Sequence, residues 1–154
     1  MSNSKLLITK FTELYEKQDM LTKLTSREFL HGYGYSEIHC IDWIGKLDNP
    51  NVTKLSSRLS MTRSAISKII KKLVAKGAIT SYKCKDNKKE IYYKLTDKGK
   101  LLFDEHHKRH RAWEERDNKF FEKLDDKDLE TVNRFLTQFN KYLEEKIREL
   151  NFKE

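Results

Sequence analysis

Residues 61–79, MTRSAISKIIKKLVAKGAI, are predicted to form a helix that gathers small hydroxyl groups and long cations on one side. Positions 64, 67, 68 and 71 share that side by helical spacing, and no Asp or Glu occurs from Thr62 to Lys85. Hydroxyls and helix N-terminal amides bind phosphate, and arginine or lysine also binds guanine O6 and N7. The predicted DNA contacts of this helix are Thr62, Arg63, Ser64, Ser67, Lys68, Lys71 and Lys72.

The neighbours of this helix favour a nucleic-acid ligand over the alternative, a basic face that is merely solvated. A short predicted helix precedes it, and a predicted hairpin follows it, with a basic tip formed by Lys83, Lys85, Lys88 and Lys89. Two short helices joined by a tight turn, followed by a basic hairpin, make a winged helix-turn-helix, whose second helix fits the major groove of DNA. We predict that Lys88 and Lys89 reach an adjacent minor groove or its backbone.

A second group with chemical potential consists of His106 and His110, which stand four residues apart on a predicted helix. That spacing projects both imidazoles from one face and is used by zinc ligands. Both histidines also fall on the apolar stripe of their helix, so packed, hydrogen-bonded histidines are the alternative interpretation. No HExxH motif accompanies them, and we predict no enzymatic activity.

The elements that position these side chains follow from apolar periodicity and capping signals. Ser36, Thr53, Thr62 and Asp125 are the predicted N-caps, and Gly77 is predicted to end the basic helix. The predicted elements are helices over residues 5–24, 36–47, 54–60 and 62–76, a hairpin over 79–95, and two long helices over 101–124 and 125–150. The fold is therefore predicted to be mainly α with a small β-hairpin.

Charge is concentrated in one third of this 154-residue chain, whose formal net charge is +8. Residues 53–100 contain 14 Lys or Arg and three Asp or Glu, which favours an anionic partner. No apolar run is long enough to span a membrane, and the first residues do not form a secretory signal. Cys40 and Cys84 lack a CxxC partner, so we expect reduced thiols and a cytoplasmic protein.

The terminal helices carry apolar stripes that a thin winged domain is too small to cover, since only 37% of residues are hydrophobic. We predict a twofold dimer, which would place two recognition helices about 34 Å apart, or one turn of the duplex. The alternative is that these helices fold back on their own core. A single domain is expected over 1–154, with the helix-turn-helix at 52–75, the wing at 79–95 and dimerisation helices at 1–30 and 101–154.

The chain resembles the MarR family of bacterial transcriptional regulators over nearly its whole length. The resemblance is carried by NVTKLSSRLSMTRSAISKIIKKLVAKGAI, by the wing KDNKKEIYYKLTDKGK with its LTxxG signature, and by the long terminal helices. It implies a homodimer that represses genes by occupying a palindromic operator. The wing departs from the family pattern, because Asp86-Asn87-Lys88 replaces Asp-x-Arg. Lysine lacks the planar fork of arginine, so we expect weaker minor-groove reading, or reading shared with Lys89.

The resemblance also implies an effector site. In the zinc-responsive branch of the family, a histidine of the second helix and two histidines four apart on the fifth helix bind zinc. His39, His106 and His110 match those positions, and Asp19 stands for the acidic ligand of that branch. The cysteine that the branch uses before the second helix has no equivalent at that place.

Two other effectors remain open. The family's other usual ligand is a small aromatic or phenolic compound in the cleft between the dimer helices and the DNA-binding core. Its candidate lining residues are Tyr15, Tyr33, Tyr35, Trp43 and Trp113, for which ordinary core packing is the alternative. Oxidation of Cys84, which lies between two lysines, is the third option.

The resulting functional prediction is a dimeric, sequence-specific regulator that binds double-stranded DNA and is expected to act as a repressor. A sequence-neutral architectural DNA-binding protein is the alternative, and a winged helix that contacts proteins is a third class. A regulator binds its operator far more tightly than other DNA, whereas an architectural protein binds all duplexes with similar affinity. A winged helix that contacts proteins should not bind duplex DNA.

Overall fold

A computed structural model describes residues 2–26 and 32–151 of the chain. Its elements are α1 (Asn3–Ser26), α2 (Tyr35–Lys46), α3 (Val52–Leu59), α4 (Arg63–Ala75), β1 (Ile79–Cys84), β2 (Asn87–Leu95), α5 (Asp97–Phe121) and α6 (Asp126–Asn151). The strands pair antiparallel, with Ile79 opposite Leu95 and an irregularity between Tyr82 and Cys84. This architecture confirms the predicted fold class. Among the described residues, no helix is both long and apolar enough to cross a membrane.

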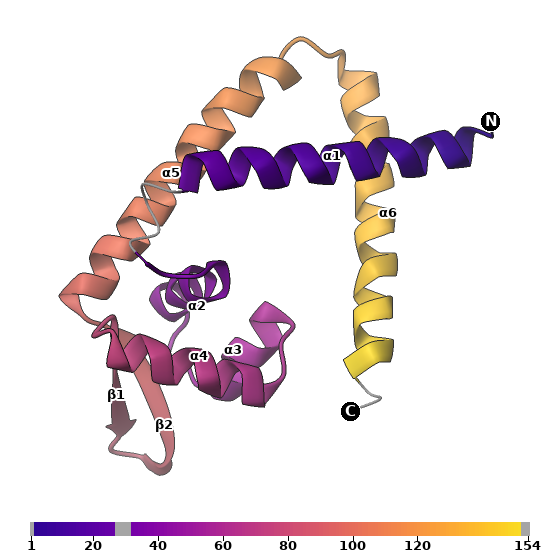
Figure 1. The fold of residues 1–154 in the computed structure, drawn as a ribbon. Coiled ribbons are helices and arrows are strands. Elements are labelled where there is room, and N and C mark those ends of the chain that lie inside the picture. Colours follow the sequence, from indigo (N-terminus) through magenta and orange to yellow (C-terminus); the bar gives the residue numbers. More distant parts are fainter. Residues whose placement is uncertain (1, 27–31, 152–154) are drawn as a thin grey trace.

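The elements form a compact group and an extended frame (Figure 1). The helices α2, α3 and α4 gather beside the hairpin, and α5 leads away from this group toward α6. The helix α1 crosses α6, where the ring of Phe11 lies 5.9 Å from that of Phe135 and 5.3 Å from that of Phe139. The long helices therefore contact one another around an aromatic crossing point and extend beyond the compact group.

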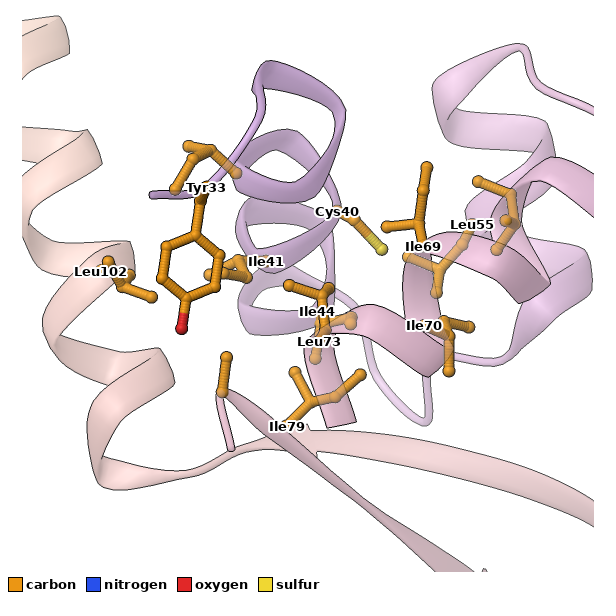
Figure 2. Packing of buried hydrophobic residues seen from close by; sticks show 13 residues of the cluster. Tyr33, Cys40, Ile41, Ile44, Leu55, Ile69, Ile70, Leu73, Ile79 and Leu102 are labelled. Atoms are coloured by element: carbon orange, nitrogen blue, oxygen red, sulfur yellow. The ribbon is translucent and has the colours of Figure 1, made fainter. Parts of the chain in front are cut away.

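The core of the compact group forms where α2, α3, α4 and the start of β1 converge (Figure 2). The inner face of α4 supplies four of its side chains, because residues three and four apart on a helix face the same way. Its buried side chains are Ile66, Ile69, Ile70 and Leu73. Burial of each such side chain contributes about 1.5–3 kcal/mol, so α4 is held firmly by its inner face.

Three predicted helix-end signals are confirmed. The Thr62 hydroxyl accepts a hydrogen bond from the amide of Ala65 at 3.2 Å and caps α4. Gly77 follows α4 with a φ of 73°, a left-handed conformation that glycine adopts without a steric cost. The Asp125 carboxylate accepts a hydrogen bond from the amide of Asp128 at 2.8 Å at the start of α6. The N-caps at Thr62 and Asp125 satisfy amides that a helix N-terminus leaves without intrahelical partners.

Two predicted caps are wrong. The N-cap of α2 is Gly34 rather than Ser36, and the carboxylate of Glu37 reaches back to accept a hydrogen bond from the Gly34 amide at 2.7 Å. The N-cap of α3 is Asn51 rather than Thr53, which lies inside the helix. Asn51 has the extended backbone of an N-cap, and asparagine is a better cap than threonine, so the helix begins earlier than predicted.

The LTxxG sequence joins the wing to α5 through two close contacts. The Thr96 hydroxyl donates a hydrogen bond to the carbonyl oxygen of Gly77 at 2.6 Å, and the same oxygen atom of Thr96 accepts one from the amide of Gly99 at 3.2 Å. A Cβ atom at Gly99 would lie 2.0 Å from the carbonyl oxygen of Ala78, so only glycine fits. The motif therefore fixes the start of α5 against the turn that follows α4.

Candidate nucleic-acid interface

The outer face of α4 presents the predicted contact residues to solvent. Because the inner face is buried, the remaining side chains of the helix point outward. Six of the seven predicted residues are exposed, namely Thr62, Arg63, Ser64, Lys68, Lys71 and Lys72, and Ser67 is half-buried. The structure thus places all seven on the side of α4 that does not pack on the core.

The turn between α3 and α4 is fixed by its own hydrogen bonds. Ser60 adopts a left-handed conformation with a φ of 51° and ends α3. The Ser56 hydroxyl donates a hydrogen bond to the carbonyl oxygen of Met61 at 2.5 Å, and the amide of Met61 donates to the carbonyl oxygen of Ser56 at 3.2 Å. These reciprocal bonds hold the two helices in the fixed arrangement that a helix-turn-helix needs.

The tip of the hairpin is rigid and basic. Its lysines Lys83, Lys85, Lys88 and Lys89 are all exposed. The side-chain oxygen of Asn87 accepts hydrogen bonds from the amides of Lys89 at 3.2 Å and Glu90 at 3.3 Å, which orders the turn. Behind the tip, the rings of Tyr82 and Tyr92 lie 5.7 Å apart on facing strands.

A cleft of about 270 Å³ lies between the starts of α3 and α4 and the second wing strand. Its lining residues are Asn51, Val52, Thr53, Arg63, Lys89, Glu90, Ile91 and Tyr93. The cleft brings Arg63 of the recognition helix and Lys89 of the wing to one surface. Sequence reasoning missed Asn51 and Glu90 in this surface. The sequence did contain a signal for Glu90, which is an acidic residue within a lysine-rich wing. A carboxylate there repels a polyanion, so its presence indicates a structural role.

The histidines lie together between α2 and α5, away from the recognition face. The ring centroid of His106 is 5.5 Å from that of His39 and 4.4 Å from that of His110. Burial, and then the neighbouring His110, lower the pKa of His106 to about 4. Burial also lowers the pKa of His110 and the pKa of His39. These three imidazoles are therefore neutral at pH 7, as a metal ligand must be.

The neutral imidazoles do not form a complete ligand group in this arrangement. Arg109 Nη2 lies 3.2 Å from His106 Nδ1, and since arginine can only donate, the Nδ1 lone pair is occupied. Asp19 pairs with Lys23 at 2.5 Å on the exposed surface of α1. In the described residues, no group of three or more His, Cys, Asp or Glu side chains is arranged to hold a metal ion. A zinc site would need a rearrangement around His106.

The structure does not gather the candidate aromatic residues into one pocket. Tyr33 is buried in the core, and Tyr15 lies on the exposed surface of α1. Trp43 lies beneath the guanidinium of Arg58, whereas Trp113 lines a different cleft along α5. Tyr35 stacks with the ring of His39. The single chain therefore offers no shared aromatic cavity built from this set.

The two cysteines differ in their surroundings. Cys40 is fully buried in the core, and burial raises the pKa of its thiol to about 12, which makes it unreactive. Cys84 is half-buried on the wing, with its sulfur 3.8 Å from the side-chain oxygen of Asn49.

Comparison with known proteins identifies the family. Residues 35–91 match the sequence profile of the MarR family. The chain is 35% identical over 109 residues to the HTH-type transcriptional regulator PchR of Bacillus subtilis, covering 71% of this chain and 64% of PchR. It is 34% identical over 108 residues to the HTH-type transcriptional regulator YvnA of the same organism, covering 70% of this chain and 69% of YvnA.

Solved structures share the fold. Streptococcus pneumoniae FabT in complex with DNA superposes with a TM-score of 0.81 at 21% identity, over 93% of this chain and 99% of FabT. Lactococcus lactis ZitR, described as a zinc-responsive MarR family member, superposes with a TM-score of 0.64 at 14% identity, over 86% of this chain and 97% of ZitR. The fold agrees with the profile match and the sequence relatives, which show that the chain belongs to the MarR family of DNA-binding transcriptional regulators.

Proposed function

We propose that this protein is a homodimeric, sequence-specific regulator that represses transcription by occupying a palindromic operator. The observation that carries the proposal is the two-sidedness of α4. Its inner face is buried in the core, while its outer face holds hydroxyls and cations beside a basic wing. That combination suits a helix seated in the major groove with a wing on the flanking backbone or minor groove.

Each part of the surface has a distinct proposed role. Arg63 and Lys68 contact guanine in the major groove, because long cations at the N-terminal half of a recognition helix reach base edges. Thr62 and Ser64 bind phosphate together with the amides at the start of α4. The other cations of the helix and the wing neutralise phosphates, and these are Lys71, Lys72, Lys88 and Lys89.

The dimer is supported by apolar surface that the single chain leaves exposed. Along α6, large side chains face solvent, including Val132, Leu136, Tyr142, Leu143, Ile147 and Leu150. The N-terminal helix shows the same feature at Leu6, Leu7, Ile8, Leu14, Met20, Leu21 and Leu24. Exposed apolar side chains that continue along a helix mark an interaction surface. In a twofold dimer, a second copy of the chain presents the same surface to the first. We therefore propose that the dimer interface is formed by the apolar faces of the helices within residues 1–30 and 101–154.

The test is a binding selection from a pool of random duplexes with the full-length protein. The proposal expects enrichment of a palindrome whose half-sites lie about 10 base pairs apart, centre to centre. A sequence-neutral architectural DNA-binding protein would bind the pool without enriching any sequence. Absence of an enriched sequence, despite measurable binding, would therefore overturn the regulator in favour of that alternative.

A second proposal concerns the effector. We propose that zinc binds at His39, His106 and His110, because these neutral imidazoles lie in adjoining ring contacts between α2 and α5. The imidazole nitrogens of these histidines would hold the ion, which would supply a Lewis-acid centre. Asp19 can serve as the fourth ligand only if its carboxylate separates from Lys23. Alternatively, the equivalent aspartate of the partner subunit would have to lie close to the three histidines.

Zinc affinity and DNA affinity test this proposal separately. Metal-stripped protein should bind zinc in competition with a chromophoric chelator, and a His106→Ala, His110→Ala double variant should not. His107→Gln is the matched control, because the His107 side chain lies 2.9 Å from the Asp42 carboxylate and is outside the proposed ligand set. If zinc changes operator affinity, the operator must change zinc affinity by the same factor. Equal zinc affinity of the wild-type and double-variant proteins would refute the site.

A further inference from the structure

Glu90 is an acidic residue on a surface that otherwise suits a polyanion. The wing, residues 79–95, contains two acids, Asp86 and Glu90, and Glu90 follows directly after Lys88 and Lys89. It also lines the cleft beside Arg63. A carboxylate near phosphates weakens binding by repulsion, so its presence on this face calls for a compensating structural role.

The contacts of Glu90 join the wing to the start of α3. Asn51 Nδ2 donates a hydrogen bond to Glu90 Oε2 at 3.0 Å. The other side-chain atom of Asn51, Oδ1, accepts a hydrogen bond from the amide of Lys54 at 2.9 Å and caps α3. One asparagine thus connects the helix-turn-helix to β2, although Asn51 and Glu90 are 39 residues apart in sequence.

One further hydrogen bond ties the same strand to the segment before α3. The amide of Tyr93 donates a hydrogen bond to the carbonyl oxygen of Pro50 at 3.0 Å, directly before Asn51. The Glu90 carboxylate also raises the pKa of Tyr92, because it accepts a hydrogen bond from that hydroxyl. The strand is therefore tied to residues 50–51 by its backbone at Tyr93 and by a side chain at Glu90.

On β2, the tie at Glu90 is the one nearest to Lys88 and Lys89, whereas β1 is tied separately by the Tyr82 hydroxyl, which donates a hydrogen bond to Asn49 Oδ1 at 2.8 Å. Lys89 and Lys88 lie only one and two residues before Glu90, and the Asn87 side chain links the tip to the amides of Lys89 and Glu90. Without the bond to Asn51, β2 would be held to the segment before α3 only from Tyr93 onward, and the position of Lys88 and Lys89 would depend on the pairing of β2 with β1. Pairing between two strands is weakly stable alone.

We infer that Glu90 is a positioning residue for DNA binding, which holds the wing against the start of α3 and so sets the reach of Lys88 and Lys89 relative to α4. The inference rests on the proposed contact of the wing with DNA. The Glu90 carboxylate acts through its hydrogen bond with Asn51 and does not contact a DNA base.

A double-mutant cycle tests the inference on the full chain. Affinity is measured by fluorescence anisotropy on a duplex of about 30 base pairs taken from the random-pool selection. Lys88→Ala should weaken binding of the wild-type protein about fivefold through the loss of a phosphate contact. In a Glu90→Ala background, the same substitution should weaken binding by less than about twofold, because the wing is no longer held in place.

Matched variants separate position from charge. Asp86→Ala removes the same charge from the same wing, and Glu90→Gln retains an acceptor for Asn51, so Lys88→Ala should keep its full effect in both backgrounds. Asn51→Asp removes the donor but keeps the cap of α3, and it should suppress the effect of Lys88→Ala as Glu90→Ala does. A folding defect cannot mimic this pattern, because it would not remove the effect of one lysine selectively.

The outcomes distinguish the inference from the function on which it rests. If Lys88→Ala weakens binding equally in the wild-type, Glu90→Ala and Asn51→Asp backgrounds, the positioning role is overturned and the wing contact stands. If Lys88→Ala leaves the wild-type affinity unchanged, the proposed wing contact fails, and the inference fails with it. Suppression confined to Glu90→Ala and Asn51→Asp supports the inference.

Discussion

The guanidinium of Arg109 lies against the ring of His106, with Nη2 3.2 Å from Nδ1, at the buried contact between α2 and α5. Because arginine only donates, the imidazole accepts and remains neutral. Burial and the neighbouring His110 lower the pKa of His106 to about 4 from the model-compound value of 6.5. The same contact that keeps His106 neutral also occupies a nitrogen that a metal ion would need.

The burial of His106 predicts that the protein loses stability as the pH falls from 7 to 5. The unfolded chain binds a proton at this histidine near pH 6.5, whereas the folded chain resists protonation down to about pH 4. The stabilising contribution is therefore full above pH 6.5 and is lost progressively below it. At pH 5 the loss due to His106 should be about 1–2 kcal/mol. Urea unfolding at both pH values should show a smaller loss in His106→Gln, and an equal loss would contradict the account.

Lys68 on the outer face of α4 should contribute to DNA affinity without contributing to stability. If Lys68 contacts a base, Lys68→Ala is expected to weaken operator binding by about 1–3 kcal/mol. If Lys68 contacts a phosphate, the slope of log affinity against log salt concentration should fall in magnitude by about one. Lys141→Ala, an exposed lysine on α6, is the matched control and should change neither quantity. Affinities measured over a series of salt concentrations decide between these outcomes. A similar loss in both variants would mean that α4 has no special role.

Gly99 should be intolerant of a methyl group. A Cβ atom there would lie 2.0 Å from the backbone oxygen of Ala78, so the turn after α4 would have to shift. Gly99→Ala is expected to lower the free energy of unfolding by about 2–4 kcal/mol. Gly34→Ala is the comparison, because its Cβ would meet only a side-chain oxygen at 3.8 Å, and the exchange of a glycine N-cap for alanine should cost at most about 1 kcal/mol. Equal unfolding curves for the two variants would contradict the packing described for Thr96 and Gly99.

The dimer proposal predicts that a charge on the exposed apolar face of α6 separates the subunits. Val132 is 50% exposed in the single chain, and Val132→Glu would place a carboxylate within the proposed interface. Sedimentation equilibrium should show a weakened dimer with unchanged helix content by circular dichroism. Thr137→Glu adds the same charge on the polar face of the same helix, one turn from Asn133 and Lys141, and should leave the dimer intact. A monomeric wild-type protein, or an unaffected Val132→Glu variant, would contradict the proposed interface.

Local sequence signals predicted the DNA-binding elements well, because their causes are local. The apolar spacing of Ile66, Ile69, Ile70 and Leu73 follows from helical geometry, and the cap at Thr62 depends on a residue only three positions away. The order of helices and the hairpin was predictable for the same reason. The caps of α2 and α3 were not, because several adjacent polar residues compete to begin a helix.

Contacts between distant segments were the part that the sequence did not reveal. The bond between Asn51 and Glu90 depends on how the wing folds back on α3, and the crossing of Phe11 with Phe135 and Phe139 depends on the angle between two long helices. Helical spacing put His106 and His110 on one face, but it gave no indication that Arg109 would occupy a ring nitrogen. Such details follow from packing, which no single segment specifies.

The measurement that tests the central claim most directly is the ratio of affinities for the selected palindrome and for a scrambled duplex of equal length, at one physiological salt concentration. A sequence-specific regulator should bind the palindrome at least about 1,000-fold more tightly, and an Arg63→Ala, Lys68→Ala double variant should lose most of that ratio. A ratio near one in the wild-type protein, with strong binding to both duplexes, would contradict the claim that α4 reads a DNA sequence.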